Sequence, residues 1–198
     1  MNKRRIRTSI LISGRGSNML SLIEAAKAPD YPAEIIQVVS NIPGALGLER
    51  AEELGIPVHT ISHRNYKSRA SFDKALDNFL RSVNTKLICC AGFMRILTPD
   101  FVEGWDGRIL NIHPSLLPKY KGLNTHARAI EAGDEYHGCT VHHLTAELDS
   151  GQIIAQAKVK LSSDDTAETL AAKVIVEENR IYPDALDMIA MGLLSTEK

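Results

Sequence analysis

The sequence lacks long apolar runs, and it lacks an excess of charge of either sign. No window in its 198 residues approaches the ~20 apolar residues that a membrane-spanning helix needs. A net charge of −1 argues against a general binder of nucleic acid or another polyanion. The basic N-terminus is followed by an apolar run, residues 10–12, that is too short for a signal peptide. We therefore expect a cytoplasmic protein with no membrane or nucleic-acid partner.

Cysteine is also scarce. The three cysteines are Cys89, Cys90 and Cys139, and the first two are adjacent within an apolar run. Neighbouring side chains of a strand point to opposite faces of a sheet, so this pair is not placed to form part of a disulfide framework. A reducing compartment suits such a sequence.

Short β-branched runs alternate with amphipathic stretches in the first half of the chain. The pattern predicts strands over residues 8–12, 35–39, 58–61, 87–91 and 109–112, and helices over residues 18–27, 46–54 and 71–83. This alternation indicates an α/β fold: a Rossmann-like, open and mostly parallel sheet with helices on both faces. The length suits one domain over residues 1–198, without repeats or a linker.

The second half changes character. Strand-like runs over residues 140–144 and 153–161 flank a turn at Asp149, Ser150 and Gly151, which predicts an antiparallel extension of the sheet. A final helix is expected over residues 165–191. Asp165 and Glu168 have the spacing of a capping box, and Pro183 is expected to kink or split this helix.

A glycine-rich run directly follows the first predicted strand and opens a helix. It comprises Ser13, Gly14, Arg15, Gly16, Ser17 and Asn18. Free N–H groups at a helix start attract anions, and glycine allows a ligand to approach the backbone. Met19 replaces the third glycine of the dinucleotide fingerprint, and no acidic residue follows the second strand, so a single phosphate monoester is favoured. The alternative is a tight turn in which Asn18 caps the helix.

Two polar residues end the fifth predicted strand. Asn111 and His113 are two apart, so their side chains face the same side, at the edge where open α/β sheets bind ligands. An amide and an imidazole together suit a developing oxyanion. The alternative is a polar strand end in which a neighbour satisfies His113. Asp149, taken alone, is more simply a solvated turn carboxylate.

The other residues that could belong to a functional site are interpreted as structural. The histidines His126, His137, His142 and His143 lack a zinc-ligand spacing, and no cysteine is paired with a nearby base. No metal is expected. Trp105 is expected to pack in the core.

Several segments together resemble the glycinamide ribonucleotide formyltransferases of purine biosynthesis, within the folate-dependent formyltransferases. The matching segments are residues 13–18, 40–41, 47–51, 91–97, 110–120, 137–142, 147–149 and 178–183. They occur in order over nearly the whole chain. The stretch 111–118 is specific to folate formyltransferases as a class, and the glycine-rich run indicates this member of the class.

The resemblance implies roles for individual residues. It implies a catalytic trio of Asn111, His113 and Asp149. It implies ribonucleotide contacts in the N-terminal half from Gly14, Arg15, Gly16, Ser17 and Asn18, together with Glu178. It implies a folate pocket, associated with the C-terminal half, that includes Arg69, Met94, Arg95, Ile96, Leu97, Arg108 and Asn111. The implied co-substrate is 10-formyltetrahydrofolate, without a metal, and a homodimer is possible.

The implied activity is transfer of a formyl group from that folate to the amine of glycinamide ribonucleotide. Lys121, Asn124 and Ser150 depart from the residues common in the family, which affects contacts around the site more than the chemistry. Two alternatives share part of the pattern: a 10-formyltetrahydrofolate hydrolase, which uses water as acceptor, and a non-enzymatic phosphate-binding module. A methionyl-tRNA formyltransferase is disfavoured, because the chain is not basic and a tRNA-binding domain is not expected.

Overall fold

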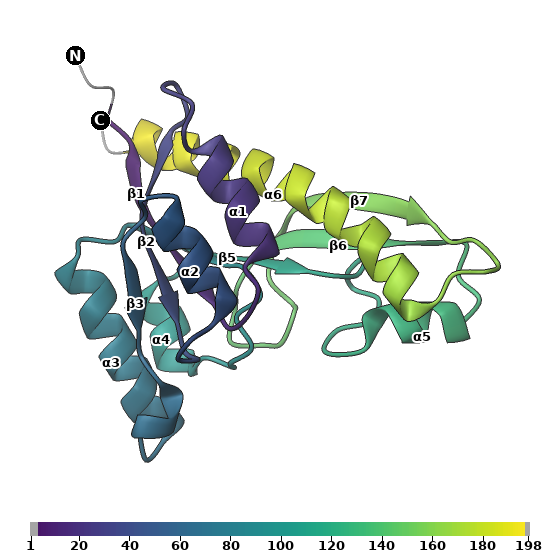
Figure 1. The fold of residues 1–198 in the computed structure, drawn as a ribbon, viewed down its shortest axis with the longest axis horizontal. Coiled ribbons are helices and arrows are strands. Elements are labelled where there is room, and N and C mark those ends of the chain that lie inside the picture. Colours follow the sequence, from purple (N-terminus) through teal and green to yellow (C-terminus); the bar gives the residue numbers. More distant parts are fainter. Residues whose placement is uncertain (1–3, 197–198) are drawn as a thin grey trace.

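The computed structural model describes residues 4–196 and contains a seven-stranded sheet in the order β3-β2-β1-β4-β5-β6-β7 (Figure 1). The strands are β1 (Ile6–Ile12), β2 (Ala33–Ser40), β3 (Val58–Thr60), β4 (Leu87–Cys90), β5 (Ile109–His113), β6 (Tyr136–His143) and β7 (Ile153–Lys160). The first five run parallel, and β6 and β7 pair antiparallel. The predicted mostly parallel sheet with an antiparallel extension is therefore confirmed.

Helices cover both faces of the sheet. They are α1 (Ser17–Ala25), α2 (Leu46–Glu53), α3 (Arg69–Ser82), α4 (Pro99–Gly104), α5 (Thr125–Glu131) and α6 (Ala167–Thr196), with a short 3-10 helix η1 (His63–Asn65). One core lies between the sheet and α1, α2 and α6, and a second lies between the sheet and α3 and α4 (Figure 1). Cys89 belongs to the first core and Cys90 to the second, which confirms the predicted opposite orientation.

Strand β6 begins four residues earlier than the sequence pattern predicted, at Tyr136. The early part of the strand contains Gly138, which has low strand propensity. A Cβ at Gly138 would lie 1.9 Å from the Ala157 carbonyl oxygen on β7. Glycine is therefore required here because the two strands approach closely, and pairing overrides propensity.

The predicted capping box of the last helix is wrong. Helix α6 begins at Ala167, and the reciprocal hydrogen bonds are made by Thr166 and Thr169, at 2.9 and 3.3 Å. The Asp165 carboxylate instead accepts hydrogen bonds from the Ser162 N–H at 2.8 Å and from Lys173 at 2.7 Å. Asp165 therefore closes the turn before the helix.

Helix α6 is not split at Pro183, contrary to the alternative that the sequence left open. A proline inside a helix costs about 3 kcal/mol. Packing offsets this cost, because Ile181, Tyr182, Ala185 and Leu186 on both sides of the proline are buried against the sheet. The Tyr182 hydroxyl also donates to the Cys90 and Leu110 carbonyl oxygens, at 3.1 Å each.

None of the helices described between residues 4 and 196 is long and apolar enough to cross a membrane.

Candidate active site

Most of the candidate residues lie at or near the carboxyl ends of β1, β4 and β5. Parallel strands of an open α/β sheet bind ligands at this edge, near the point where the strand order reverses. Here β1 lies between β2 and β4, so the loops after β1 and β4 leave side by side. Ser13 shows how close these loops are: its N–H donates to the Gly92 carbonyl oxygen at 3.1 Å, and its hydroxyl accepts from the Met94 N–H at 2.7 Å.

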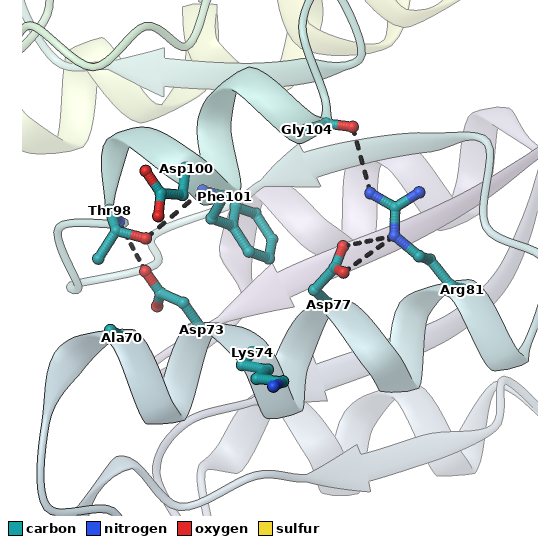
Figure 2. A pocket seen from close by; sticks show the side chains of 9 residues that line it. All are labelled: Ala70, Asp73, Lys74, Asp77, Arg81, Thr98, Asp100, Phe101 and Gly104. Atoms are coloured by element: carbon teal, nitrogen blue, oxygen red, sulfur yellow. Dashed lines mark hydrogen bonds and ion pairs between the residues drawn. The ribbon is translucent and has the colours of Figure 1, made fainter.

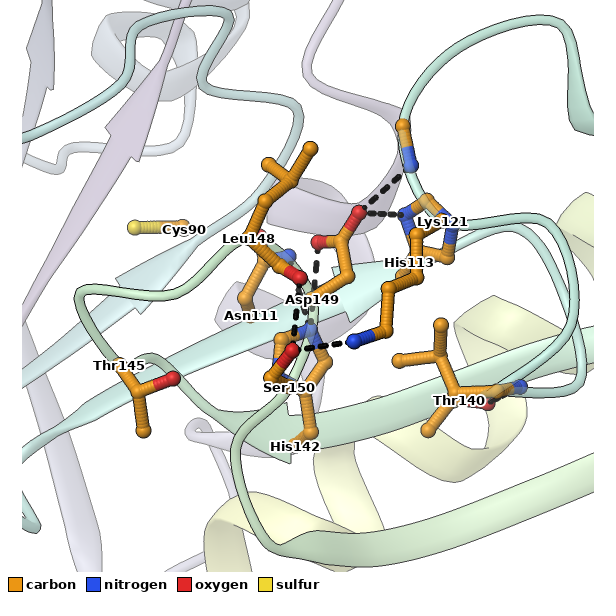
Figure 3. A network of polar contacts seen from close by, with 12 residues as sticks. Cys90, Asn111, His113, Lys121, Thr140, His142, Thr145, Leu148, Asp149 and Ser150 are labelled. Atoms are coloured by element: carbon orange, nitrogen blue, oxygen red, sulfur yellow. Dashed lines mark hydrogen bonds and ion pairs between the residues drawn. The ribbon is translucent and has the colours of Figure 1, made fainter.

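Asn111 and His113 lie in the last part of β5. In the register of β5 with β6, Asn111 faces His142 and His113 faces Thr140. His113 is buried, and Asn111 is half-buried. Strand periodicity places both side chains on the same face, as their spacing predicted. Figure 3 shows both side chains directed toward the turn that carries Asp149.

Asp149 reaches this pair from the turn between β6 and β7. Its Oδ2 lies 3.4 Å from His113 Nδ1 and accepts a hydrogen bond from the Gly122 N–H at 2.8 Å. Its Oδ1 lies 3.8 Å from His142 Nε2. The Asp149 side chain is only 9% exposed, so this carboxylate is not the solvated turn residue that its local sequence favoured. The structure thus brings Asn111, His113 and Asp149 together (Figure 3).

The second ring nitrogen of His113 contacts the loop after β5. His113 Nε2 lies 2.9 Å from the Tyr120 carbonyl oxygen. A carbonyl oxygen only accepts, so Nε2 carries the proton of this hydrogen bond. Tyr120 has a φ of 56°, in the left-handed region that non-glycine residues rarely adopt. The loop conformation therefore places a protein acceptor against the nitrogen that faces away from Asp149.

His142 contacts Asn111 from the neighbouring strand. Its Nδ1 donates to the His143 carbonyl oxygen at 2.9 Å, and its Nε2 lies 3.2 Å from Asn111 Nδ2. His142 is 1% exposed, and burial lowers its pKa below the ordinary value of 6.5. Sequence reasoning missed this residue, because the signal is the cross-strand register of β5 and β6 and not a motif.

Two departures from the family pattern contact each other. The Lys121 ammonium donates to the Ser150 hydroxyl, and it lies 3.5 Å from Glu147 Oε1. These residues join the loop after β5 to the turn after β6 (Figure 3). Asn124, the third departure, has a φ of 58° and precedes α5 as its N-terminal flanking residue.

At the glycine-rich run, the starts of α1 and α2 lie close together. Gly16 has a φ of 72° and immediately precedes α1, and the Gly47 N–H at the start of α2 donates to the Gly14 carbonyl oxygen at 2.9 Å. A Cβ at Gly16 would lie 2.9 Å from Met19 Cε and 3.1 Å from Gly47 Cα. No side chain caps α1, so its first-turn N–H groups face the loop.

Asn18 does not cap α1, so that alternative is wrong. It is the second residue of the helix, and its Nδ2 donates to Glu178 Oε2 at 2.8 Å. Both residues are buried, and burial raises the pKa of Glu178 to about 7, although the Asn18 hydrogen bond partly opposes this shift. The contact brings α6 to the glycine-rich run. Arg15 is exposed, and Ser17 is half-buried.

The loop after β4 presents apolar side chains to solvent. Met94 is 71% exposed and Ile96 is 59% exposed, whereas Leu97 is buried in the second core. The Arg95 guanidinium lies 5.9 Å from the Phe72 ring centroid. Within residues 4–196, the buried Arg95 Nε has no hydrogen-bond partner.

Two expected folate residues lie apart from the trio. Arg69 is the exposed first residue of α3. Arg108 precedes β5, at the opposite end of that strand from His113, and its guanidinium lies 4.9 Å from the Trp105 ring centroid. Trp105 is 1% exposed and donates from Nε1 to Asp77 at 2.7 Å, which confirms that it packs in the core.

A groove of about 330 Å³ lies between α3 and α4 (Figure 2). None of the expected site residues lines this groove. Three of its charged residues contact the protein itself: Arg81 Nε donates to both Asp77 oxygens, at 2.8 and 2.9 Å, and Asp73 accepts from the Thr98 N–H at 2.6 Å. The groove therefore lies between two helices that contact each other, and it is not part of the candidate site.

Two further histidines lie beside the loop after β5. His126 Nδ1 and His137 Nε2 are 3.1 Å apart, and burial lowers the pKa of His137 to about 4. Across the described part of the chain, no group of three or more His, Cys, Asp or Glu side chains is arranged to hold a metal ion.

Comparisons with known proteins give a consistent picture. The family described as formyl transferase matches residues 6–186. The chain is 45% identical over 185 residues to the phosphoribosylglycinamide formyltransferase of Escherichia coli, covering 93% of this chain and 87% of that protein. It is 46% identical over 189 residues to the trifunctional purine biosynthetic protein adenosine-3 of Bos taurus, covering 96% of this chain but 19% of that protein. The chain thus spans about a fifth of the length of that trifunctional relative.

Solved structures are similar over the same extent. The phosphoribosylglycinamide formyltransferase of Brucella melitensis superposes with a TM-score of 0.91 at 48% identity, covering 94% of this chain and 96% of that chain. Glycinamide ribonucleotide transformylase 1 of Symbiobacterium toebii superposes with a TM-score of 0.92 at 40% identity, covering 95% and 89%.

Proposed function

Because this chain belongs to the formyl transferase family, we propose that it transfers the formyl group of 10-formyltetrahydrofolate to the amine of glycinamide ribonucleotide. The product is N-formylglycinamide ribonucleotide, an intermediate of purine biosynthesis. The observation that carries the proposal is the contact of Asp149 with His113 beside Asn111. Similarity to bacterial phosphoribosylglycinamide formyltransferases over most of their length supports the choice of acceptor.

The ribonucleotide binds at the glycine-rich run. Its phosphate takes the N–H groups at the start of α1, where the helix dipole and the approach over Gly14 and Gly16 favour an anion. Arg15 is exposed beside this position and adds positive charge. Glu178, held by Asn18, is the acceptor for hydroxyl groups of the ribose. The same site therefore holds both the phosphate and the ribose of the substrate.

The reduced folate binds beside the loop after β4 and supplies the activated formyl carbon. The residues present fit this group. Met94 and Ile96 offer exposed apolar surface for a flat heteroaromatic ring, and the unpartnered Arg95 Nε offers a buried donor nearby. Ser13 fixes the backbone of this loop through its hydrogen bond with Met94. Arg69 and Arg108 remain part of the proposal as residues for the outer parts of the folate.

Asn111 and His113 act on the formyl oxygen. Asn111 donates a hydrogen bond from its amide as negative charge develops there. His113 supplies a second donor, and the Asp149 carboxylate lies 3.4 Å from its Nδ1. A preorganised donor of this kind typically lowers the barrier by ~2.7–4 kcal/mol. Asp149 also orients a water that carries the proton from the attacking amine to the folate nitrogen, as the bond between that nitrogen and the formyl carbon breaks.

Without substrate, the Tyr120 carbonyl oxygen accepts the hydrogen bond that His113 Nε2 donates. The formyl oxygen therefore competes with this carbonyl for the same proton. The loop after β5 thus couples substrate binding to the availability of His113.

An acceptor-dependent assay tests the proposal. The protein is mixed with 10-formyltetrahydrofolate, and the folate absorbance is followed with and without glycinamide ribonucleotide. We expect a change only when the ribonucleotide is present, and a much slower change with the corresponding riboside, which lacks the phosphate. An equal change without any acceptor would identify a hydrolase, and no change under any condition would leave a phosphate-binding module.

The cytoplasmic location, the absence of nucleic-acid and membrane partners, and the homodimer belong to the same proposal. The three cysteines are buried free thiols, which suits a reducing compartment. Sedimentation over a range of concentrations measures the oligomeric state directly.

A further inference from the structure

His142 is the buried neighbour of Asn111 that the reaction outlined above does not use. It lies on β6 directly opposite Asn111 in the antiparallel register. Its ring contacts two protein groups through two different nitrogens, at 2.9 Å to the His143 carbonyl oxygen and at 3.2 Å to Asn111 Nδ2. These two contacts together determine where the imidazole proton lies.

The His143 carbonyl oxygen can only accept, so His142 Nδ1 must donate and carries the proton. In a neutral imidazole the other nitrogen then has a lone pair and no proton. Burial lowers the pKa of His142, so the neutral ring dominates at physiological pH. Nε2 is therefore an acceptor, and the group that faces it must be a donor.

The acceptor at Nε2 fixes the amide of Asn111. The two ends of an asparagine amide have nearly the same shape and differ only in hydrogen bonding. With Nε2 unprotonated, Asn111 must turn its NH₂ group toward His142 and hold Oδ1 away. One N–H is then used by His142, and the second has a fixed direction.

We propose that His142 is a positioning residue that fixes the Asn111 amide so that its second N–H is ready for the formyl oxygen. This inference rests on the proposed formyl transfer. A donor that is already oriented requires no reorganisation as charge develops, which is the condition under which such groups are most effective.

The same protonation state keeps His142 from competing for Asp149. Asp149 Oδ1 lies 3.8 Å from His142 Nε2, and an unprotonated nitrogen has no hydrogen to donate to it. The carboxylate is left to His113 and the Gly122 N–H. Protonation of His142 would create a new ion pair with Asp149 and remove the acceptor of Asn111. The ionisable groups that face His142 are Asp149, His113 and His143, and its partner on β7 is the apolar Ile153.

Two substitutions separate positioning from packing. His142→Gln retains an acceptor near the position of Nε2, whereas His142→Leu removes it and keeps an apolar side chain of similar size. We expect His142→Leu to lower kcat roughly 10- to 100-fold, with little change in either KM, because the effect appears mainly in the transition state. His142→Gln should retain activity within about fivefold of the wild type.

The effect must pass through Asn111. In an Asn111→Ala background we expect His142→Leu to lower kcat by less than about threefold, since no amide remains to be oriented. An equal loss in both backgrounds, or an equal loss for Leu and Gln, would show that His142 acts only through packing and would overturn the inference.

A spectroscopic measurement provides a test that does not depend on catalysis. In wild-type protein labelled with ¹⁵N-histidine, His142 should show a protonated Nδ1 and an unprotonated Nε2 at neutral pH, with its signals identified by their loss in His142→Gln. A protonated Nε2 would refute the inference. Wild-type protein that fails the acceptor-dependent assay would refute the proposed function instead, and active wild type with full activity in His142→Leu would refute only the role of His142.

Discussion

His113 Nδ1 lies 3.4 Å from Asp149 Oδ2, although the two residues belong to a strand end and to a distant turn. The same carboxylate oxygen accepts a hydrogen bond from the Gly122 N–H, and the other His113 nitrogen donates to the Tyr120 carbonyl oxygen. One loop therefore contacts both members of the pair. The imidazole, the carboxylate and this loop form a single unit, and its behaviour as a unit is open to test.

The first prediction concerns that unit. Asp149→Asn removes the charge but retains an oxygen for the Gly122 N–H. We expect it, His113→Ala and Asn111→Ala each to lower kcat by roughly 100-fold or more with modest changes in KM. The double variant of His113→Ala with Asp149→Asn should be little worse than the worse single variant. Steady-state kinetics of folded variants measures this. Full activity in Asp149→Asn would remove the carboxylate from the mechanism, and strict additivity would assign the two residues independent tasks.

The second prediction concerns the glycine-rich run. A Cβ at Gly14 would meet nothing within 4 Å, whereas a Cβ at Gly16 meets Met19 and Gly47 at a positive φ. We expect Gly14→Ala to leave Tm unchanged and to raise the ribonucleotide KM, because the methyl group restricts approach to the backbone. Gly16→Val should raise this KM sharply and also lower Tm, while folate binding remains nearly intact in both.

Gly14→Ala is the sharper of the two variants, because a change in its KM has no contribution from unfolding. Thermal unfolding monitored by circular dichroism provides the control for each. If the ribonucleotide KM is unchanged in both folded variants, the run is only a strand-to-helix turn.

The third prediction concerns stability at acidic pH. Burial lowers the pKa of His137 from 6.5 to about 4, so between these values the unfolded chain binds a proton that the folded chain does not. Stability is therefore retained above pH 6.5 and is lost as the pH falls toward 4. At about 1.4 kcal/mol per pKa unit, His137 accounts for roughly 3 kcal/mol of this loss.

Urea unfolding of wild type and His137→Gln at a series of pH values isolates this contribution. The difference in unfolding free energy between the two proteins should fall as the pH decreases from 6.5 to 4. His142 and His143 also have lowered pKa values, and they cancel in this comparison, whereas His126 contacts His137 and its contribution changes with the substitution. A difference that does not change with pH would contradict the prediction.

The fourth prediction concerns the contact between Lys121 and Ser150. This hydrogen bond joins the loop that carries Tyr120 and Gly122 to the turn that carries Asp149. Ser150→Gly removes the bond and loosens the turn, so we expect faster amide hydrogen exchange in residues 119–124 and 145–150. Lys121→Met keeps most of the aliphatic chain and should have a similar effect.

The two changes should not add when combined, because each removes the same bond. The coupling free energy is expected to be about 0.5–1 kcal/mol, as for a partly exposed polar pair. Additive effects on hydrogen exchange would mean that the two residues stabilise their loops separately.

Local sequence determined the framework of the fold. Alternating strands and helices predicted the parallel sheet, because parallel neighbours need crossover connections. The two-residue spacing of Asn111 and His113 predicted a shared face, and the adjacent Cys89 and Cys90 were predicted to face opposite cores, because side chains alternate along any strand. These predictions depend only on backbone periodicity, which does not change with the rest of the chain.

Tertiary structure decided the partners. The local sequence of Asp149 favoured a solvated turn, and only the resemblance to a family associated it with His113. Asp149 and Tyr120 adopt φ values of 46° and 56°, which intrinsic propensity disfavours and which the surrounding contacts must impose. His142 faces Asn111 because of the register between β5 and β6, and a shift of one residue would turn it to the other side of the sheet. Pairing register and loop closure depend on contacts between residues far apart in the chain, and for this reason local patterns predicted the strands but not the groups that meet at their ends.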